Sequence, residues 1–133
     1  MSARDFIARA RSRLSAAPAP KTKHPDVDAA LARIAEETNY VTLGHIAKEF
    51  MATPFYAVLE ERLNAKADAL HEDLLSGAVG PDAYARAYKT IKDVLLLAPS
   101  AVERGQKAGE QLKEWREDGT LEEAELWRSH PKE

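Results

Sequence analysis

The chain has 133 residues, of which 44% are hydrophobic and 31% are charged, with no cysteine and a formal net charge of −3. Its length is that of one ordinary domain, and the absence of cysteine excludes disulfides and thiolate metal sites. The longest uncharged apolar run, Val94 to Ala98, is far shorter than the ~20 residues of a transmembrane helix, and Arg9 interrupts the apolar start that a secretory signal requires.

Residues 2–16 are predicted to form a basic amphipathic helix with Phe6, Ile7 and Leu14 on its apolar face. The segment Ala17-Pro18-Ala19-Pro20 ends this helix, because proline fixes φ and has no N–H donor. We therefore expect residues 1–24 to form an N-terminal arm, a basic helix on a Pro/Ala linker, and residues 25–133 to form one helical domain. The basic residues of the arm are Arg4, Arg9, Arg11, Arg13, Lys21 and Lys23.

Two further helices are predicted before residue 52. Pro25 suits the first turn of a helix, which is expected to end near Thr38 with Asn39 as its C-terminal cap. Thr42 is expected to cap a separate short helix that ends near Met51.

A helical hairpin over residues 54–98 is the strongest pattern in the sequence. Thr53 and Pro54 supply an N-cap and a first-turn proline, residues 76–80 form the turn, and Pro81 begins a second helix that Pro99 ends. Because their apolar faces must be hidden from water, the two helices should pack antiparallel. The apolar residues, spaced by three or four, are Tyr56, Leu59, Leu63, Ala67, Leu70 and Leu74, then Tyr84, Tyr88, Ile91, Leu95 and Ala98.

Two capping boxes predict two short helices near the C-terminus. Ser100-Ala101-Val102-Glu103 and Thr120-Leu121-Glu122-Glu123 each place a hydroxyl and a carboxylate three residues apart, so a helix should begin just after each hydroxyl. No alternating β pattern of useful length appears. The expected fold is therefore all-α: an antiparallel helical hairpin core with additional short helices and a basic N-terminal helix.

The sequence contains no recognisable catalytic or metal-binding arrangement. No two histidines are four residues apart, as a zinc-binding helix would require, and no Gly-x-Gly-x-x-Gly, P-loop or Gly-x-Ser-x-Gly motif occurs. Paired carboxylates such as Glu60 and Glu61 suit a solvated helix face. We therefore expect no enzyme activity, no metal, no cofactor and no small-molecule substrate.

Two sets of residues are candidates for contact with a partner. The basic residues of the arm can neutralise phosphates of DNA, whereas Phe6, Ile7 and Leu14 can dock the same helix on a protein. Trp115 and Trp127 either anchor the C-terminal helices to the hairpin or bind a partner as hot spots.

Residues 42–63 resemble the two-helix core of helix-turn-helix domains, which implies DNA binding. The segment departs from that pattern at Met51, where glycine is usual. Glu60 and Glu61 on the second helix also oppose contact with phosphate. The alternative interpretation is a helical corner in which Phe50, Phe55 and Leu59 pack together.

The stretch Thr53-Pro54-Phe55-Tyr56, followed by the leucines of the hairpin and closed by Leu95-Leu96-Leu97-Ala98-Pro99, resembles small helical proteins in the structural modules of tailed bacteriophages. This resemblance covers residues 53–99. It implies a virion or assembly component, such as a ring, connector, portal-associated or capsid-associated subunit.

We expect a non-enzymatic structural subunit that binds protein partners, in a homo-oligomer or a larger assembly. The expected location is the cytoplasm or a virion, with no membrane contact. The alternative function is DNA binding, as a small packaging subunit or a regulator, through the arm or residues 42–63.

Overall fold

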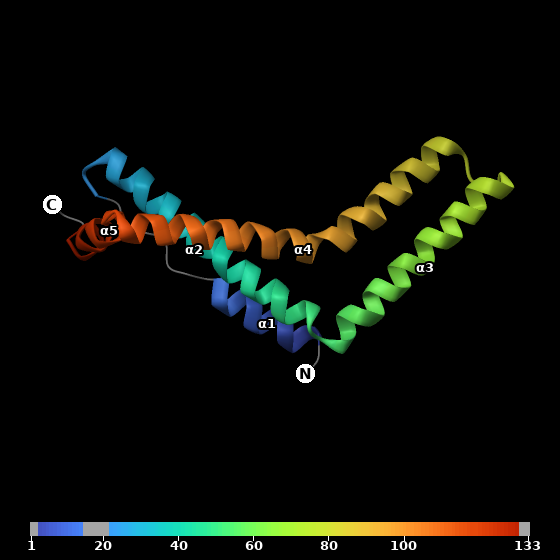
Figure 1. The fold of residues 1–133 in the computed structure, drawn as a ribbon, viewed down its shortest axis with the longest axis horizontal. Helices are drawn as coiled ribbons and strands as arrows, with labels where there is room; N and C mark the ends of the chain where they lie inside the picture. The colour runs from blue at the N-terminus through green and yellow to red at the C-terminus, as the bar shows by residue number, and fades with distance from the viewer. Residues whose placement is uncertain (1–2, 15–21, 131–133) are drawn as a thin grey trace. The chain divides into compact units, whose positions relative to one another are not determined.

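The computed structural model describes residues 3–14 and 22–130, and all regular structure in these ranges is α-helical (Figure 1). The all-α class predicted from the sequence is therefore confirmed. The Pro/Ala linker at residues 17–20 and Lys21 lie outside the described residues. The helices are α1 (Ala3–Leu14), α2 (Pro25–Met51), α3 (Pro54–Ser76), α4 (Pro81–Glu117) and α5 (Thr120–Ser129).

The chain divides into two compact units, and α2 and α4 each contribute to both. Unit 1 comprises residues 1–46 and 101–133, so it contains α1, most of α2, the C-terminal part of α4, and α5. Unit 2 comprises residues 47–100, which are the end of α2, all of α3 and the first part of α4. The assignment of residues 25–133 to one domain remains a prediction.

Within unit 1, the backbones of α2 and α4 touch where Gly44 meets Gly105. A Cβ atom added to Gly105 would lie 2.8 Å from Cα of Gly44 and 2.9 Å from the carbonyl oxygen of Tyr40. Both distances are shorter than a carbon side chain tolerates, so only glycine allows this approach. One turn further along α4, Ala108 is completely buried. Small residues therefore let the two helices pack at backbone distance.

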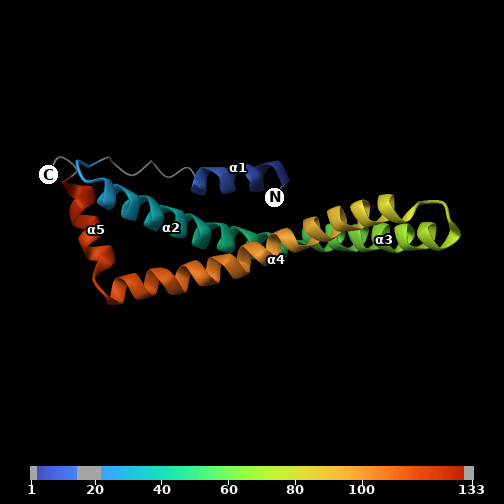
Figure 2. The same cartoon turned by 90° about the horizontal axis from the view of Figure 1, so that it is seen from above.

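The apolar core of unit 1 lies where α5 joins α2 and α4. Leu31 and Ile34 of α2 and Ala124 of α5 are buried together, and Trp115 and Trp127 pack against them. Figure 2 shows α5 running between the C-terminal end of α4 and the N-terminal end of α2. Three helices thus close one small core.

Unit 2 is a two-helix hairpin, in which α3 and the first part of α4 lie side by side in both views (Figures 1 and 2). The Thr53 hydroxyl accepts a hydrogen bond from the backbone N–H of Tyr56 at 3.3 Å, so Thr53 caps α3 as predicted. Gly77 ends α3 in the left-handed conformation with a φ of 81°. Because α3 has no buried residue, unit 2 has no core comparable to that of unit 1.

The helix break expected between Thr38 and Thr42 is wrong, because α2 continues through these residues to Met51. The Thr38 hydroxyl donates to the Ile34 carbonyl at 2.8 Å, and the Thr42 hydroxyl donates to the Thr38 carbonyl at 3.2 Å. Both threonines therefore bond back along a continuous helix, as interior threonines do. The contact of Gly44 with α4 keeps this segment helical.

The helix end expected at Pro99 and the new start at Ser100 are also wrong, because α4 runs through both residues. Proline in a helix interior removes one backbone hydrogen bond and costs about 3 kcal/mol. In the following residues of α4, Gly105 packs against the backbone of α2 and Ala108 is completely buried, and this burial offsets the cost. The capping box at Ser100 therefore does not act as a helix start.

The second capping box predicts the start of a helix correctly, but the predicted capping hydrogen bonds do not form. Helix α5 begins at Thr120, yet its N-cap is Gly119, which makes no side-chain capping bond. Thr120 instead donates from its backbone N–H to Oδ1 of Asp118 at 2.9 Å, and its hydroxyl donates to the same oxygen. These two hydrogen bonds lower the pKa of Asp118.

We predict that Gly105→Ala lowers the free energy of unfolding by about 1–3 kcal/mol, because the new methyl group overlaps backbone atoms of α2. Gly109→Ala is the matched control. Its added Cβ meets only a Val41 methyl at 4.0 Å, so it should raise the free energy of unfolding by about 0.5–1 kcal/mol. Chemical denaturation of the full chain, followed by circular dichroism, measures both. Equal stabilisation by the two substitutions would contradict the backbone contact.

Candidate interaction surfaces

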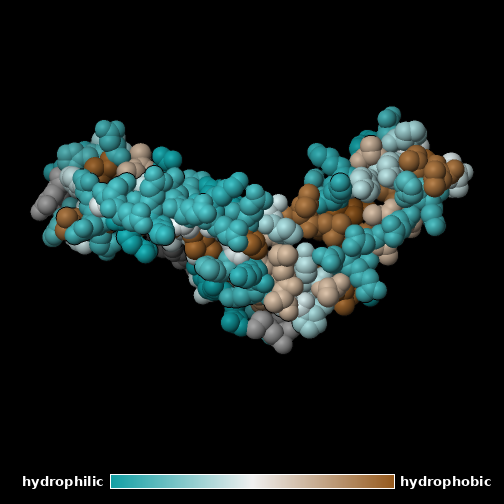
Figure 3. Space-filling view, in the orientation of Figure 1, coloured by the Kyte–Doolittle hydropathy of each residue, from teal (hydrophilic) through white to brown (hydrophobic). Residues whose placement is uncertain are grey.

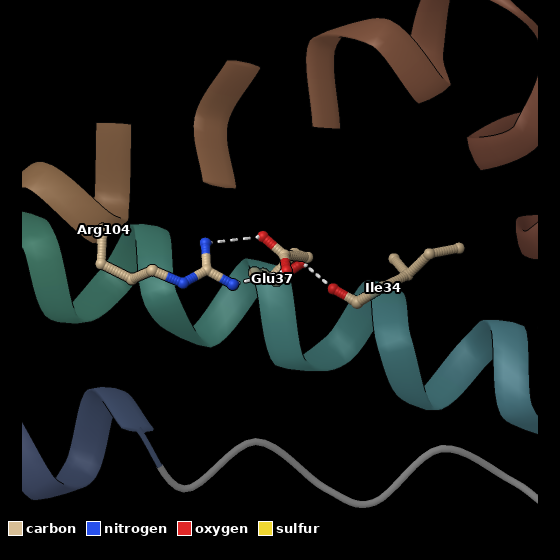
Figure 4. A network of polar contacts seen from close by, with 4 residues as sticks. Ile34, Glu37 and Arg104 are labelled. Atoms are coloured by element: carbon tan, nitrogen blue, oxygen red, sulfur yellow. Dashed lines mark hydrogen bonds and ion pairs between the residues drawn. The ribbon is translucent and has the colours of Figure 1, made fainter. Parts of the chain in front are cut away.

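The most constrained polar group in unit 1 joins α2 to α4 beside the two glycines (Figure 4). Arg104 donates from Nη2 to Oε1 of Glu37 at 2.7 Å and from Nη1 to Oε2 at 3.2 Å. The guanidinium carbon also lies 4.0 Å from the ring centroid of Tyr40, a cation–π contact. Arg104 is therefore held on both sides by α2.

Both members of this pair stay charged. The hydrogen bond from Arg104 lowers the pKa of Glu37, although partial burial of the carboxylate opposes that shift. The same hydrogen bond raises the pKa of Arg104. The Glu37 side chain is only 12% exposed, so substrate has little access to its oxygens. We interpret the pair as a clamp between two helices.

The described residues hold no other obvious place for chemistry. Across residues 3–14 and 22–130, no polar or charged residue is buried and no group of three or more His, Cys, Asp or Glu side chains could hold a metal ion. A pocket of about 190 Å³ lies between α2 and α5, lined mainly by Val27, Leu31 and Trp127. It is smaller than the ~300 Å³ at which ligand sites usually begin.

The facing stripe of the hairpin matches the predicted apolar pattern but hides it incompletely. All of the expected stripe residues, from Tyr56 to Leu74 in α3 and from Tyr84 to Ala98 in α4, are half-buried. The rings of Tyr84 and Tyr88 stack at 5.6 Å between centroids, and His71 lies 6.3 Å from Tyr84 across the hairpin. Two helices alone cannot surround these side chains.

A second apolar surface lies beside this stripe and is open to solvent. Phe55 is 55% exposed and Val58 47% exposed in α3, while Val94 is 40% and Leu97 68% exposed in α4. Figure 3 shows one face of the hairpin, on which hydrophobic surface over α4 lies beside hydrophilic surface. The sequence interpretation did not single out these residues, apart from placing Phe55 in the corner with Phe50.

Helical periodicity places these four side chains on the same side of the hairpin. At 100° per residue, Phe55 and Val58 are rotated from the stripe of α3 in the same sense as Val94 and Leu97 are rotated from the stripe of α4. In antiparallel helices, equal rotations point to one side. We call this side the outer apolar face: Phe55, Val58 and Ala69 of α3 with Ala83, Val94 and Leu97 of α4.

The opposite side of the hairpin is mainly polar. By the same geometry it carries Glu60, Asn64 and Asp68 of α3, together with Lys89 and Lys92 of α4, and all five are exposed. Leu96 also points to this side and is 55% exposed. Leu75, 75% exposed, points to the same side as Leu96, whereas Arg62, Lys66 and Asp73 lie on the side of the outer apolar face. Both sides of the hairpin therefore carry charged residues, and the outer apolar face is distinguished by four large apolar side chains.

The residues of the arm that were predicted to contact a partner differ in how far they are exposed to solvent. On α1, all four arginines and Ile7 are exposed, whereas Phe6 and Leu14 are half-buried. Lys23 is exposed, and Lys21 lies outside the described residues. The use of these residues for DNA or protein contact remains a prediction.

The two tryptophans predicted as contact residues are partly buried in unit 1. Trp115 and Trp127 both pack against the cluster of Leu31, Ile34 and Ala124. His24 meets the edge of Trp127 at 5.0 Å, and Arg33 lies 5.5 Å from the centroid of Trp115. Both rings therefore pack on residues of α2 and α5, and the predicted anchoring to the hairpin is not what the structure describes. Use of either tryptophan by a partner remains a prediction.

In residues 42–63, the structure differs from the short first helix that the helix-turn-helix resemblance implies. Residues 42–51 are the end of the 27-residue helix α2, and the corner to α3 is at residues 52–53. Phe50 lies 6.2 Å from Phe55 and 5.4 Å from Tyr56, between ring centroids. Phe50 therefore contacts Phe55 and Tyr56 at the corner, while the part of Leu59 in this corner and DNA binding by this segment remain predictions.

Comparison of the chain with protein-family models, with curated proteins and with solved structures gave no match. Among the helices that the structure describes, none combines the length and apolarity needed to cross a membrane. The assignment of function therefore depends on the surfaces themselves.

We predict that Glu37→Gln lowers the free energy of unfolding at pH 7 by about 1 kcal/mol and flattens its acid dependence. Because the folded pKa of Glu37 is lowered, its contribution is complete above its ordinary pKa of about 4.3 and is lost as the pH falls through the folded value. Denaturation curves between pH 3 and pH 7 measure this. The exposed neighbour supplies the control, Glu36→Gln, and an equal effect of both substitutions would contradict the clamp.

Proposed function

We propose that this protein is a non-enzymatic interaction subunit of a larger protein assembly, in which the outer apolar face of the hairpin docks on a protein partner. The observation that carries this proposal is the exposure of four large apolar side chains, Phe55, Val58, Val94 and Leu97, on one side of the hairpin. No residue of α3 is fully buried, so this helix lacks the packing of a core helix. Contiguous apolar surface of this kind marks interaction sites in soluble proteins.

The energetics favour docking. Covering four half-exposed large side chains gains about 1 kcal/mol each, or about 4 kcal/mol in all. A whole domain is stable by only about 5–15 kcal/mol, so this gain is substantial for a two-helix unit. Isolated helices are marginal in water, and α3 and α4 shield each other on one stripe only.

The resemblance of residues 53–99 to bacteriophage structural-module proteins supports a specific form of this proposal. A ring, connector, portal-associated or capsid-associated subunit uses repeated helix contacts and performs no chemistry. The Glu37–Arg104 clamp and the glycine contact suit this role, because they stiffen the helices that carry the hairpin.

DNA binding is the second candidate, and one observation favours it. The four arginines of α1 are all exposed. A basic helix of this kind neutralises phosphates without reading sequence, which suits a packaging subunit or an accessory DNA-binding protein.

We predict that the photo-cross-linker p-benzoylphenylalanine, placed at Phe55 of the full chain in the cells or particles that contain it, gives a light-dependent covalent product with a protein. Phe55 lies on the outer apolar face near the start of α3, whereas Asn64 lies on the opposite side of the same helix. The same cross-linker at Asn64 should give no product. Absence of a product at both positions, or equal yields at both, would sink the proposed docking surface.

For the alternative function, replacing Arg4, Arg9, Arg11 and Arg13 by alanine should abolish duplex binding. If each arginine contacts one phosphate, the slope of log K against log salt concentration should fall by about 3–4 units. Mobility-shift titrations at stepped salt concentrations measure this slope. The double substitution Lys89→Ala and Lys92→Ala on the hairpin is the control and should leave the slope unchanged. Wild-type protein that fails to bind DNA at low salt would exclude this function.

A further inference from the structure

We propose that the occupant of the outer apolar face is the same face of a second copy of this chain, with the two hairpins packed base over tip in a four-helix bundle. This inference deepens the proposed function and rests on it. The base is the end with Phe55 and Leu97, and the tip is the turn at residues 76–81. A two-fold axis across the middle of the hairpin relates the copies.

The distribution of side-chain size along the face is self-complementary. The large residues Val58, Val94 and Leu97 lie near the base, whereas the half nearer the tip carries Ala69 and Ala83. Base-over-tip packing places the large side chains near the base of one copy over small residues near the tip of the other, with Phe55 over the turn. Base-over-base packing would instead crowd the large residues together and leave the alanines apart.

The charges on this face select the same arrangement. Asp73 lies eighteen residues after Phe55, which is five full helical turns, so it has the same angular position. Arg62 and Lys66 lie on the same side of α3, between these two residues. Neither Arg62 nor Asp73 has a side-chain ion pair among the described residues.

One two-fold axis satisfies both size and charge. When Arg62 of one copy faces Asp73 of the other, the axis crosses α3 between residues 67 and 68, close to its middle. The same axis sets Val58 over Gly77 of the second copy and brings Leu97 near Ala83 of the second copy. Arg62 and Asp73 therefore pair twice, and Lys66 of each copy lies near the axis, over Ala69 of the other. The base-over-base arrangement gives Arg62 no acidic residue on the facing surface.

The available area suits a stable dimer. The 23 residues of α3 span about 35 Å, and two helices side by side are about 20 Å wide. One face therefore offers about 700 Å² per copy, or about 1,400 Å² in total, within the usual range for specific interfaces. Four antiparallel helices would then enclose the half-buried stripes of both hairpins in one core.

Leu97→Glu in the full chain tests this proposal against a neighbour of similar exposure, Leu96→Glu on the opposite side of the hairpin. Sedimentation equilibrium and native mass spectrometry should show a wild-type dimer. Leu97→Glu should raise the dimer Kd at least 100-fold, and Leu96→Glu should leave it within about threefold. Circular dichroism confirms that both variants remain helical.

A charge exchange tests the arrangement of the two copies independently of hydrophobicity. Arg62→Glu alone and Asp73→Arg alone should each weaken the dimer by about tenfold, and the double exchange should restore it. A dimer that the double exchange fails to restore, or that Leu96→Glu weakens as much as Leu97→Glu does, overturns the base-over-tip arrangement.

The outcome also separates this inference from the proposed function. A monomeric wild-type chain that still cross-links from position 55 to a different protein overturns self-pairing and leaves the docking function in place. A monomeric chain with no cross-linked product from that position overturns both.

Discussion

At Gly44 and Gly105 the backbones of α2 and α4 are in van der Waals contact, and the rest of unit 1 depends on that approach. It brings Arg104 within reach of Glu37 and the Tyr40 ring, so one cation is held by an ion pair and an aromatic face at once. Close contact at one point fixes both helices along their length. The short helix α5 then needs only a few apolar side chains to close the core.

Unit 2 has no equivalent constraint. Its helices meet through tyrosines, leucines and alanines that are half-buried at best, and the facing stripe leaves Phe55, Val58, Val94 and Leu97 outside. A helical hairpin has two flanks that a third or fourth helix normally covers. Here both flanks carry charged residues, and the flank of Phe55, Val58, Val94 and Leu97 exposes more large apolar side chains than the flank of Leu75 and Leu96, so it gains more free energy when a partner covers it.

Sequence patterns predict those parts of this fold that local chemistry decides. The cap at Thr53 and the left-handed glycine at Gly77 depend on neighbouring residues alone, so their positions are correct. Thr42 and Pro99 look equally strong as helix ends, yet packing of residues distant in sequence overrides both. The outer apolar face was missed for a related reason. Its two halves lie about 40 residues apart and look like scattered surface residues until the antiparallel arrangement places them together.

Pro99 lies inside α4, between its closely packed C-terminal part and its weakly packed hairpin part. A proline within a helix forfeits about 3 kcal/mol, so α4 stays continuous only if packing on both sides of residue 99 restores that loss. On the C-terminal side, Gly105 contacts the backbone of α2 and Ala108 is completely buried. On the N-terminal side, the hairpin supplies only a half-buried stripe. Any partner that binds the folded hairpin adds its binding free energy to this weaker side. A partner on the outer apolar face would therefore stabilise the helix across its proline as well as the hairpin that carries the face.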